Sequence, residues 1–329
     1  MSAARGHVVA IVAKLVLSAG LIAWLLHRIR WNEVATTVRA ADPAWLGAAL
    51  GMMLVSNLLG SYQWGRLLRV VDIRIPFWKV SAYYHVGLFF NNFLPANIGG
   101  DLFRIADAGR HAPSRTAAIS AVVMDRIVGL LAMATLALVT TLPALDRFHL
   151  TIIYVALVGF FALCVTLLWA VFHPRVLPGL EGVLDRVGLR RLSPHLDELA
   201  AHFAGYRGDR GLFVRMLALA LVTQIARIGV HVLVARALGL AVPLVYFFLF
   251  VPLLAVVVSL PISFNGIGVR EGAGIVVFGL VGVDRAHAFS LQFTTYLVAV
   301  AVSMLGGLVY LARIPRRRGQ ARDPRRIPR

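Results

Sequence analysis

Cysteine and acidic side chains are scarce in this chain. Its 329 residues include one cysteine, Cys164, so an internal disulfide is excluded. Only 15 Asp and Glu stand against 33 Lys and Arg, which gives a formal net charge of +18 at pH 7. The positive residues lie in loops beside apolar runs and not on a polar folded domain, a pattern typical of membrane proteins. We therefore expect no nucleic-acid partner.

The sequence also lacks the short motifs of several enzyme classes. It has no Walker A loop, which argues against ATP-driven transport, and no HExxH, GxSxG or Cys/His cluster. Asp/Glu pairs spaced for acid–base catalysis in a cleft are missing as well. We expect a transporter-like protein that is not an enzyme and that uses no catalytic residue, metal or cofactor.

Apolar residues, in contrast, are abundant: they make up 59% of the chain, and the mean hydropathy is +0.80. This composition predicts an all-α polytopic membrane protein with one integral membrane domain over 1–312 and about seven or eight spanning helices. The first apolar run is too long for a signal-peptide core and has no Ala-x-Ala site after it, so we expect it to be retained. The expected spans are 7–27, 44–63, 116–141, 150–172, 212–238, 243–260 and 286–312.

The distribution of arginine predicts the orientation of these spans. The tail 313–329 carries eight Arg and one acid, and the loop 173–211 carries six Arg, so both are expected in the cytoplasm. Within that loop, 192–203 has an apolar face and a Ser-Pro start typical of a helix, and we expect an interfacial amphipathic helix there. The prediction is a multi-pass protein of a bacterial or archaeal plasma membrane with a cytoplasmic C-terminus and a disordered tail.

Two segments interrupt the apolar pattern in matching ways. In both, a Gly lies five residues and an Arg nine residues after a proline, namely Pro95, Gly100 and Arg104, then Pro261, Gly266 and Arg270. Unpaired backbone groups in lipid cost several kcal/mol each, so irregular chain survives there only inside protein or beside a wet cavity. Paired breaks in corresponding halves of a transporter indicate its binding site.

The charge rule predicts how each break is placed. If 77–100 crossed the membrane, the four positive residues near its start, Arg66, Arg69, Arg74 and Lys79, would lie outside, so we expect this segment to enter from the cytoplasm and return. The stretch 243–283 is expected to begin and end on the outer side, because its last part, 272–283, is too short to cross. The fold prediction is therefore inverted repeats, roughly 44–141 and 212–312, with two re-entrant broken-helix hairpins.

Charged and polar residues at membrane depth are the candidate site. Free N–H groups at a broken helix and an Arg guanidinium together suit phosphate or carboxylate, and an anionic lipid headgroup fits this chemistry. We expect Asp125 and Arg126, about 15 Å into a span, to meet partners on other helices, such as Arg104 or Glu271. The predicted substrate-binding residues are Arg104, Arg126, Arg270, Asn97, Gly99, Gly100, Asn265 and Gly266; the gating or ion-pair residues are Asp101, Asp125 and Glu271; the cavity-lining residues are Asn91, Asn92, Gln224, Arg227 and His231.

Each of these assignments has a structural alternative. Arg104 and Arg270 would also serve as interfacial anchors of helix ends, and Asp125 with Arg126 as a buried ion pair that holds the repeats together. The stripe on 212–238 that contains Arg227 would also suit an interface. Further polar residues at this depth, among them Asn57, His85, Gln292 and Tyr296, are expected mostly to satisfy one another or the broken backbone.

Three strings together resemble one family: NNFLPANIGGDLFR at 91–104, MDRIVG at 124–129 and LPISFNGIGVREG at 260–272. It is the flippase-like membrane protein family related to the transmembrane domain of lysylphosphatidylglycerol synthase, and the resemblance covers nearly the whole chain. The family often has Gly-Glu and Glu-Arg where this chain has Gly100-Asp101 and Asp125-Arg126, changes that keep the charge. The resemblance implies movement of a lipid or lipid-linked headgroup between leaflets.

The two-domain synthases continue into a soluble aminoacyltransferase domain, whereas this chain ends in an Arg-rich tail, so we do not expect it to make lysyl-lipid. The predicted partners are membrane lipids, with an anionic phospholipid as the substrate. Two alternatives stay open: an accessory subunit of a membrane-bound lipid-modifying transferase, and a small-solute or ion transporter.

Overall fold

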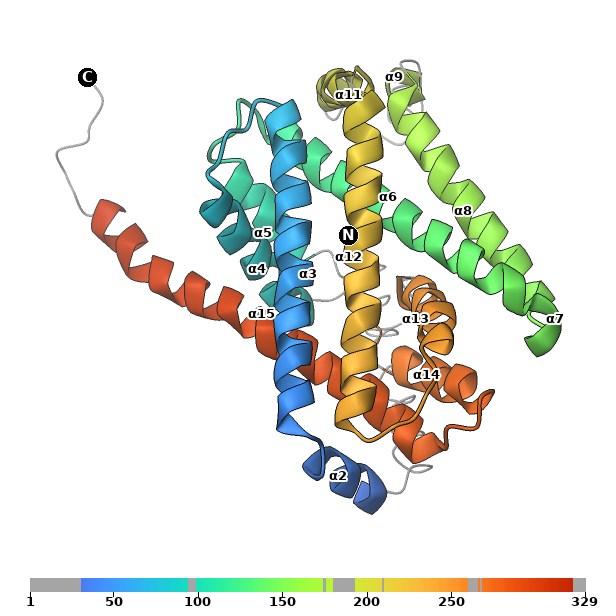
Figure 1. Ribbon diagram of the computed structural model, residues 1–329. Coiled ribbons are helices and arrows are strands. Elements are labelled where there is room, and N and C mark those ends of the chain that lie inside the picture. Colours follow the sequence, from blue (N-terminus) through green and yellow to red (C-terminus); the bar gives the residue numbers. More distant parts are fainter. Residues whose placement is uncertain are drawn as a thin grey trace, which may run out of the picture.

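The computed structural model describes residues 31–93, 99–173, 176–179, 193–208, 210–259, 266 and 268–321. Every regular element within these ranges is helical (Figure 1). The main helices are α2 Trp31–Arg39, α3 Pro43–Val70, α4 Phe77–Phe93, α5 Gly99–Ala108, α6 Arg115–Thr141, α8 Thr151–Phe172, α11 Ser193–Arg207, α12 Arg210–Ala237, α13 Leu244–Ser259, α14 Val269–Gly279 and α15 Arg285–Ala321. Short turns η2 Leu142–Ala144, α7 Leu145–Phe148 and α9 Val176–Gly179 lie between them.

Five helical segments are long and apolar enough to cross a membrane: Pro43–Val70, Arg115–Phe148, Thr151–Phe172, Gly211–Ala237 and Arg285–Arg313. Each contains or nearly coincides with a predicted span, and together they make this a multi-pass membrane protein. The predicted span 243–260 forms α13, whose 16 residues reach about 24 Å, short of the roughly 30 Å hydrocarbon core. The predicted span 7–27 lies outside the described residues.

The long helices α3 and α12 run antiparallel through the middle of the molecule (Figure 1). At one end of the pair, the N–H of Asp42 donates to the carbonyl of Ala237 over 2.8 Å. At the other end, the Tyr206 hydroxyl, just before α12, donates to the carbonyl of Leu67. The Asp42 carboxylate also accepts from the N–H of Ala44, which caps α3. These contacts fix both ends of a central helix pair.

Each sequence break joins two short helices that pack on each other. Helices α4 and α5 flank the first break, and α13 and α14 flank the second. Figure 1 shows the first pair near one end of α3 and the second pair near its other end. The predicted segment 77–100 covers α4 and only the first two residues of α5, so it is too short, because α5 continues to Ala108. Residues 94–98 between the two helices lie outside the described residues.

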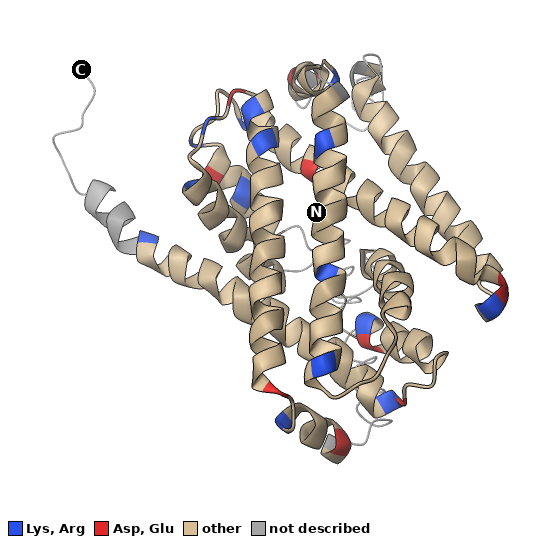
Figure 2. Cartoon of the chain, viewed as in Figure 1, with Lys and Arg blue, Asp and Glu red and all other residues tan. Residues whose placement is uncertain are grey.

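Two large buried clusters form most of the core, and a small third one joins α2 to the start of α15. One large cluster joins most of α12 and α13, α14 and α15 with the second half of α6, and the other joins α3, α4, the first half of α6, α11 and the start of α12. Helix α8 contributes little to either, since most of its residues are exposed. It has no charged residue, so its ribbon is tan in Figure 2. A long apolar helix with so much exposed apolar surface is suited to lipid contact.

Two segments predicted to be cytoplasmic, the loop 173–211 and the tail 313–329, lie partly within the described residues. Helix α11 begins at Ser193, where the Ser-Pro pair predicted a helix start, and its Phe203 and Tyr206 are buried against the bundle. The prediction that the tail from 313 onward is disordered is wrong for its first part, because α15 continues to Ala321. There the guanidinium of Arg313 donates to Asp107 of α5 over 3.0 Å and lies over the Tyr83 ring, so the helix keeps a tertiary contact beyond the apolar run.

Candidate ligand-binding cavities

Two adjoining cavities lie inside the bundle, with volumes of about 360 Å³ and about 140 Å³. Because five residues line both, the cavities share a boundary: Met133, Gln224, Arg227, Ala255 and Val258. The larger cavity is also lined by Asn91 and Arg104, on either side of the first break, and by Asp125 and Arg126 of α6. The smaller one is lined by Arg270 of the second break, together with His231 and Gln292.

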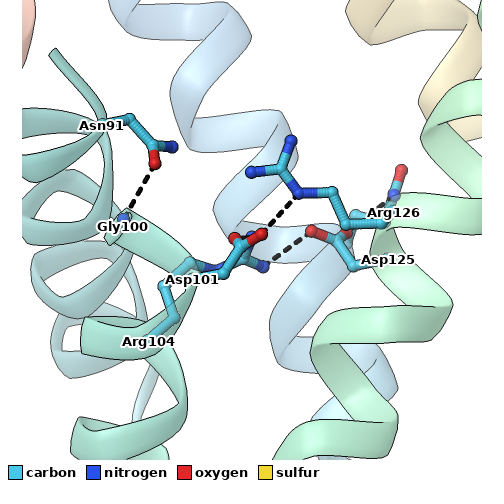
Figure 3. A network of polar contacts seen from close by, with 7 residues as sticks. Asn91, Gly100, Asp101, Arg104, Asp125 and Arg126 are labelled. Atoms are coloured by element: carbon cyan, nitrogen blue, oxygen red, sulfur yellow. Dashed lines mark hydrogen bonds and ion pairs between the residues drawn. The ribbon is translucent and has the colours of Figure 1, made fainter. Parts of the chain in front are cut away.

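A network of charges connects the first break with α6 (Figure 3). Arg104 donates to Asp125 over 2.6 Å and to Asp101 over 3.3 Å, and Arg126 donates to Asp101 over 2.7 Å. Asp101, Arg104 and Asp125 are buried, whereas 44% of the Arg126 side chain is exposed. Asp125 and Arg126 thus meet partners on α5 and not each other, because neighbouring residues of a helix point about 100° apart.

Arg104 has an aromatic as well as an ionic environment. Its guanidinium carbon lies 4.4 Å from the ring centre of Trp64 and 4.8 Å from that of Tyr84. On the far side of the network, the Gln63 amide donates to Asp125 over 2.9 Å. Cation–π contacts and a second donor stabilise the buried pair. These three neighbours were missed from the sequence, since aromatic residues and a glutamine carry no distinctive signal in an apolar helix.

The start of α5 is capped from α4. The Asn91 side-chain oxygen accepts from the N–H of Gly100 over 2.8 Å (Figure 3), and Asp101 lies in the first turn. Gly100 packs directly against the backbone of Gly87, which brings the two helices together. A carboxylate in the first turn already offsets the positive end of the helix dipole. The helix start is therefore less available to an external anion than the sequence suggested.

The second break is arranged differently. Gly266 and Gly268 have φ of +72° and +83°, a region that favours glycine, and the Glu271 carboxylate accepts from the N–H of Gly268 over 2.7 Å. The other oxygen of Glu271 accepts from Arg270 over 3.0 Å. The Arg270 guanidinium lies 4.2 Å from the ring centre of Tyr296 on α15. Glu271 pairs with its sequence neighbour, so the expectation that it would meet Asp125 or Arg126 is wrong.

The polar stripe on α12 separates the two cavities. Gln224 and Arg227 line both, and His231 lines the smaller one. The ring Nδ1 of His231 lies 3.0 Å from the carbonyl of Arg227. Because a carbonyl can only accept, Nδ1 donates. Among the residues that the structure describes, the Arg227 side chain has no ion pair and no hydrogen bond.

The structure gathers most of the predicted residues around these cavities but not all of them in the lining. The lining residues among them are Asn91, Arg104, Asp125, Arg126, Arg270, Gln224, Arg227 and His231. Asp101 and Glu271 do not line these cavities but form ion pairs with the lining arginines. Gly99, Gly100 and Gly266 are buried next to the breaks and shape the backbone. Asn92 donates to Ser303 of α15 and does not line either of these two cavities, so its assignment stays a prediction. Asn97 and Asn265 lie outside the described residues.

The expectation that the other polar groups satisfy one another also needs correction. His85 bonds the backbone of its own helix at Ser81, and Tyr296 packs under Arg270. Gln292 is fully buried, and within the described structure neither atom of its amide has a hydrogen-bond partner. In the same part of the chain, no group of three or more His, Cys, Asp or Glu is arranged to hold a metal ion.

Comparison with known proteins agrees with this architecture. The family model described as the lysylphosphatidylglycerol synthase TM region matches residues 11–307, which include both breaks and all the helices that line the cavities. A curated relative, a UPF0104 membrane protein from Pyrococcus horikoshii, is 22% identical over 311 residues, covering 85% of this chain and 91% of the relative. A match of this length shows that the chain belongs to the lysylphosphatidylglycerol synthase TM region family.

Proposed function

We propose that this protein moves an anionic phospholipid, or an anionic lipid-linked headgroup, between the leaflets of a plasma membrane. The observation that carries the proposal is the pair of adjoining cavities lined by arginines from both breaks. Buried charge is expensive at membrane depth, and ionisable residues there usually belong to a substrate or ion pathway. A headgroup that passes from one cavity to the other would meet cationic side chains along its way.

In this proposal the two helix pairs enter the membrane from opposite sides. The ends of α4 and α5 lie near the last turns of α3, which carry Arg66 and Arg69, and near loops that carry Arg74 and Arg110, so by the charge rule that end would be cytoplasmic. The pair α13–α14 then belongs to the outer side, and the C-terminus to the cytoplasm. Each cavity would be reached from its own side, as alternating access requires.

In this proposal the arginines contact the headgroup, and the carboxylates hold the arginines in position. Arg126 is exposed within the larger cavity, so it is suited to contact the headgroup, while Asp101 holds its guanidinium in place. Arg270 would act in the same way in the smaller cavity, positioned by Glu271. We assign no catalytic step to these carboxylates, because each accepts hydrogen bonds from an arginine.

A vesicle assay tests this function. Purified protein in liposomes is given a phosphatidylglycerol with a fluorescent headgroup-side label, and dithionite bleaching reports how fast the label changes leaflets. We expect faster exchange than in protein-free liposomes, and a drop of about tenfold for Arg126→Gln. Arg147→Gln, an exposed arginine in α7, is the matched control and should exchange like the wild type. Exchange no faster than in empty liposomes would refute the proposal.

The family description favours one rival enough to be tested beside it. Because the family is described from a synthase, the chain would alternatively be an accessory subunit that presents lipid to a membrane-bound modifying enzyme. That rival predicts no leaflet exchange in liposomes, together with co-purification of an enzyme and altered headgroups in a deletion strain. A transporter of small solutes or ions would move its solute into liposomes and leave the labelled lipid in place.

A further inference from the structure

The smaller cavity holds a buried amide without a partner. Gln292 of α15 lines this cavity, is fully buried, and leaves both its amide nitrogen and its amide oxygen without a hydrogen bond in the described structure. Its position is closely defined, because Gly274 of α14 leaves the space that the Gln292 chain occupies. A buried amide with neither group satisfied is costly, and such groups are usually explained by a ligand, an ion or a water.

Arg227 is the second group at this place that has no protein partner. The other cavity arginines each donate to a carboxylate: Arg104 to Asp125, Arg126 to Asp101 and Arg270 to Glu271. Within the described residues the Arg227 guanidinium has no such contact, although it is partly buried and lines both cavities. A cation removed from water without a counter-charge favours the arrival of an anion.

The balance of charge indicates what kind of anion fits. Among the residues that the structure describes, the arginines at the cavities outnumber the carboxylates that touch them by one: Arg104, Arg126, Arg227 and Arg270 stand against Asp101, Asp125 and Glu271. One negative charge would therefore neutralise the site. A phosphodiester carries one negative charge at neutral pH, whereas a phosphomonoester carries nearly two. Arg is also the side chain best matched to phosphate oxygens, because its guanidinium donates through two parallel N–H groups.

The size of the cavity agrees with a phosphate group. Its volume of about 140 Å³ is several times the roughly 10–15 Å³ that a single water requires. This is enough for one phosphate group with its ester oxygens. The adjoining cavity of about 360 Å³ provides space for the rest of a headgroup on the other side of Arg227.

We propose that Arg227 and Gln292 form a binding site for a phosphodiester monoanion in the smaller cavity, on the side where Arg227 borders the larger one, with Arg227 supplying the charge and Gln292 donating through its amide nitrogen. The inference rests on the proposed function, of which it names the ligand group and the residues that bind it. The network of Arg104, Asp125 and Asp101 would then be structural support, and Arg227 the residue that a headgroup meets from either cavity.

Direct binding tests the site. The purified protein in a non-ionic detergent is titrated with three probes: dihexanoyl phosphatidylglycerol, dihexanoyl phosphatidic acid and diethyl phosphate. We expect the wild type to bind phosphatidylglycerol more tightly than phosphatidic acid, and Arg227→Gln to bind it at least tenfold more weakly. Arg236→Gln changes an exposed arginine on the same helix and should bind like the wild type. Diethyl phosphate separates a free phosphodiester from a lipid, since a site specific for lipid binds it far more weakly.

Two further variants keep the test valid if Arg227→Gln does not fold. Arg227→Lys keeps the charge and should retain part of the affinity. Gln292→Met removes the unpaired amide, so it should bind phosphatidylglycerol several-fold more weakly while the empty protein melts at the same or a higher temperature. A purely structural role for Gln292 predicts a lower melting temperature instead.

The outcomes distinguish the site from the function. Wild-type affinity for phosphatidylglycerol in Arg227→Gln, or in both Arg227→Lys and Gln292→Met, overturns the site, even if liposomes show leaflet exchange. Binding that is lost in these variants supports the site, even if liposomes show no exchange, in which case the proposed function fails. Tighter binding of phosphatidic acid than of phosphatidylglycerol would overturn the assignment to a phosphodiester.

Discussion

Arg104 of α5 donates to Asp125 of α6 over 2.6 Å, and both side chains are buried. The contact joins α5, the helix that follows the first break, to a long apolar helix, so α5 is part of the packed interior. Asp101 accepts from both Arg104 and Arg126, which extends the link to two arginines on two helices. A buried pair of this kind is weak evidence for stability by itself, but removal of one partner leaves an uncompensated charge.

Arg104→Gln is therefore expected to lower the free energy of unfolding by about 3 kcal/mol, because Asp125 would keep its charge without its main counter-ion. The measurement is reversible unfolding in detergent micelles with added denaturant. In the double variant Arg104→Met with Asp125→Leu, neither charge is left buried. The double variant should lose clearly less free energy of unfolding than the single variants Arg104→Met and Asp125→Leu lose together. Additivity within about 0.5 kcal/mol would contradict the pairing.

Gly100→Ala tests the close contact between α4 and α5. A Cβ at this position would overlap the carbonyl oxygen of Gly87 and approach the Asn91 side-chain oxygen to 2.6 Å, and neither can move without disturbing the cap of α5. We expect unfolding to become easier by about 1–3 kcal/mol. Gly159→Ala in α8 is the matched control, because its Cβ would meet nothing within 4 Å. The control should be neutral or slightly stabilising, and equal losses in both variants would exclude a local steric cause.

Variants of Tyr296 test whether its aromatic ring stabilises the position of Arg270. The guanidinium of Arg270 lies over the Tyr296 ring, and no hydroxyl is needed for this contact. Tyr296→Phe should therefore keep the wild-type melting temperature, whereas Tyr296→Leu should lower the stability by about 1 kcal/mol. Thermal melting followed by tryptophan fluorescence measures both. A loss in Tyr296→Phe as large as that in Tyr296→Leu would show that the hydroxyl, and not the ring, is what matters.

The two breaks could be found in the sequence because their causes are local. Proline, glycine and nearby charges disrupt a helix wherever they occur, and the structure has short helices on both sides of each break. The depth of Asp125 also indicated a partner on another helix. Which residues pair could not be derived, since Arg126 meets Asp101 only because α5 packs on α6, whereas Glu271 pairs with its own sequence neighbour, Arg270.

The cavities could not be predicted from local sequence either, because they form only when distant helices pack. Arg227 and Gln292 are 65 positions apart in the sequence and come together only when α12 and α15 pack. The sequence showed both residues at membrane depth, but it gave no means to tell a satisfied amide from one without a partner. Satisfaction of a polar group depends on the atoms around it, which belong to several helices.

The side from which each helix pair enters the membrane is open to a labelling test. In a Cys164→Ala background, single cysteines replace Arg74 and Arg110, which flank α4 and α5, or Ala241 and Arg285, which flank α13 and α14. All four positions are exposed. A membrane-impermeant maleimide added to intact cells should label positions 241 and 285, and positions 74 and 110 only after the membrane is opened.

The decisive comparison is between the two labelled positions that flank one helix pair. If a helix pair enters and leaves the membrane on the same side, both of its flanking positions are labelled from that side. Labelling of position 74 from one side and position 110 from the other would mean that α4 and α5 together cross the membrane. Their 17 and 10 residues would then have to form one interrupted span, with Arg104 and Asp101 inside it. The buried charges would still be paired, but the symmetry between the breaks would be lost, and with it the basis for entry from two opposite sides.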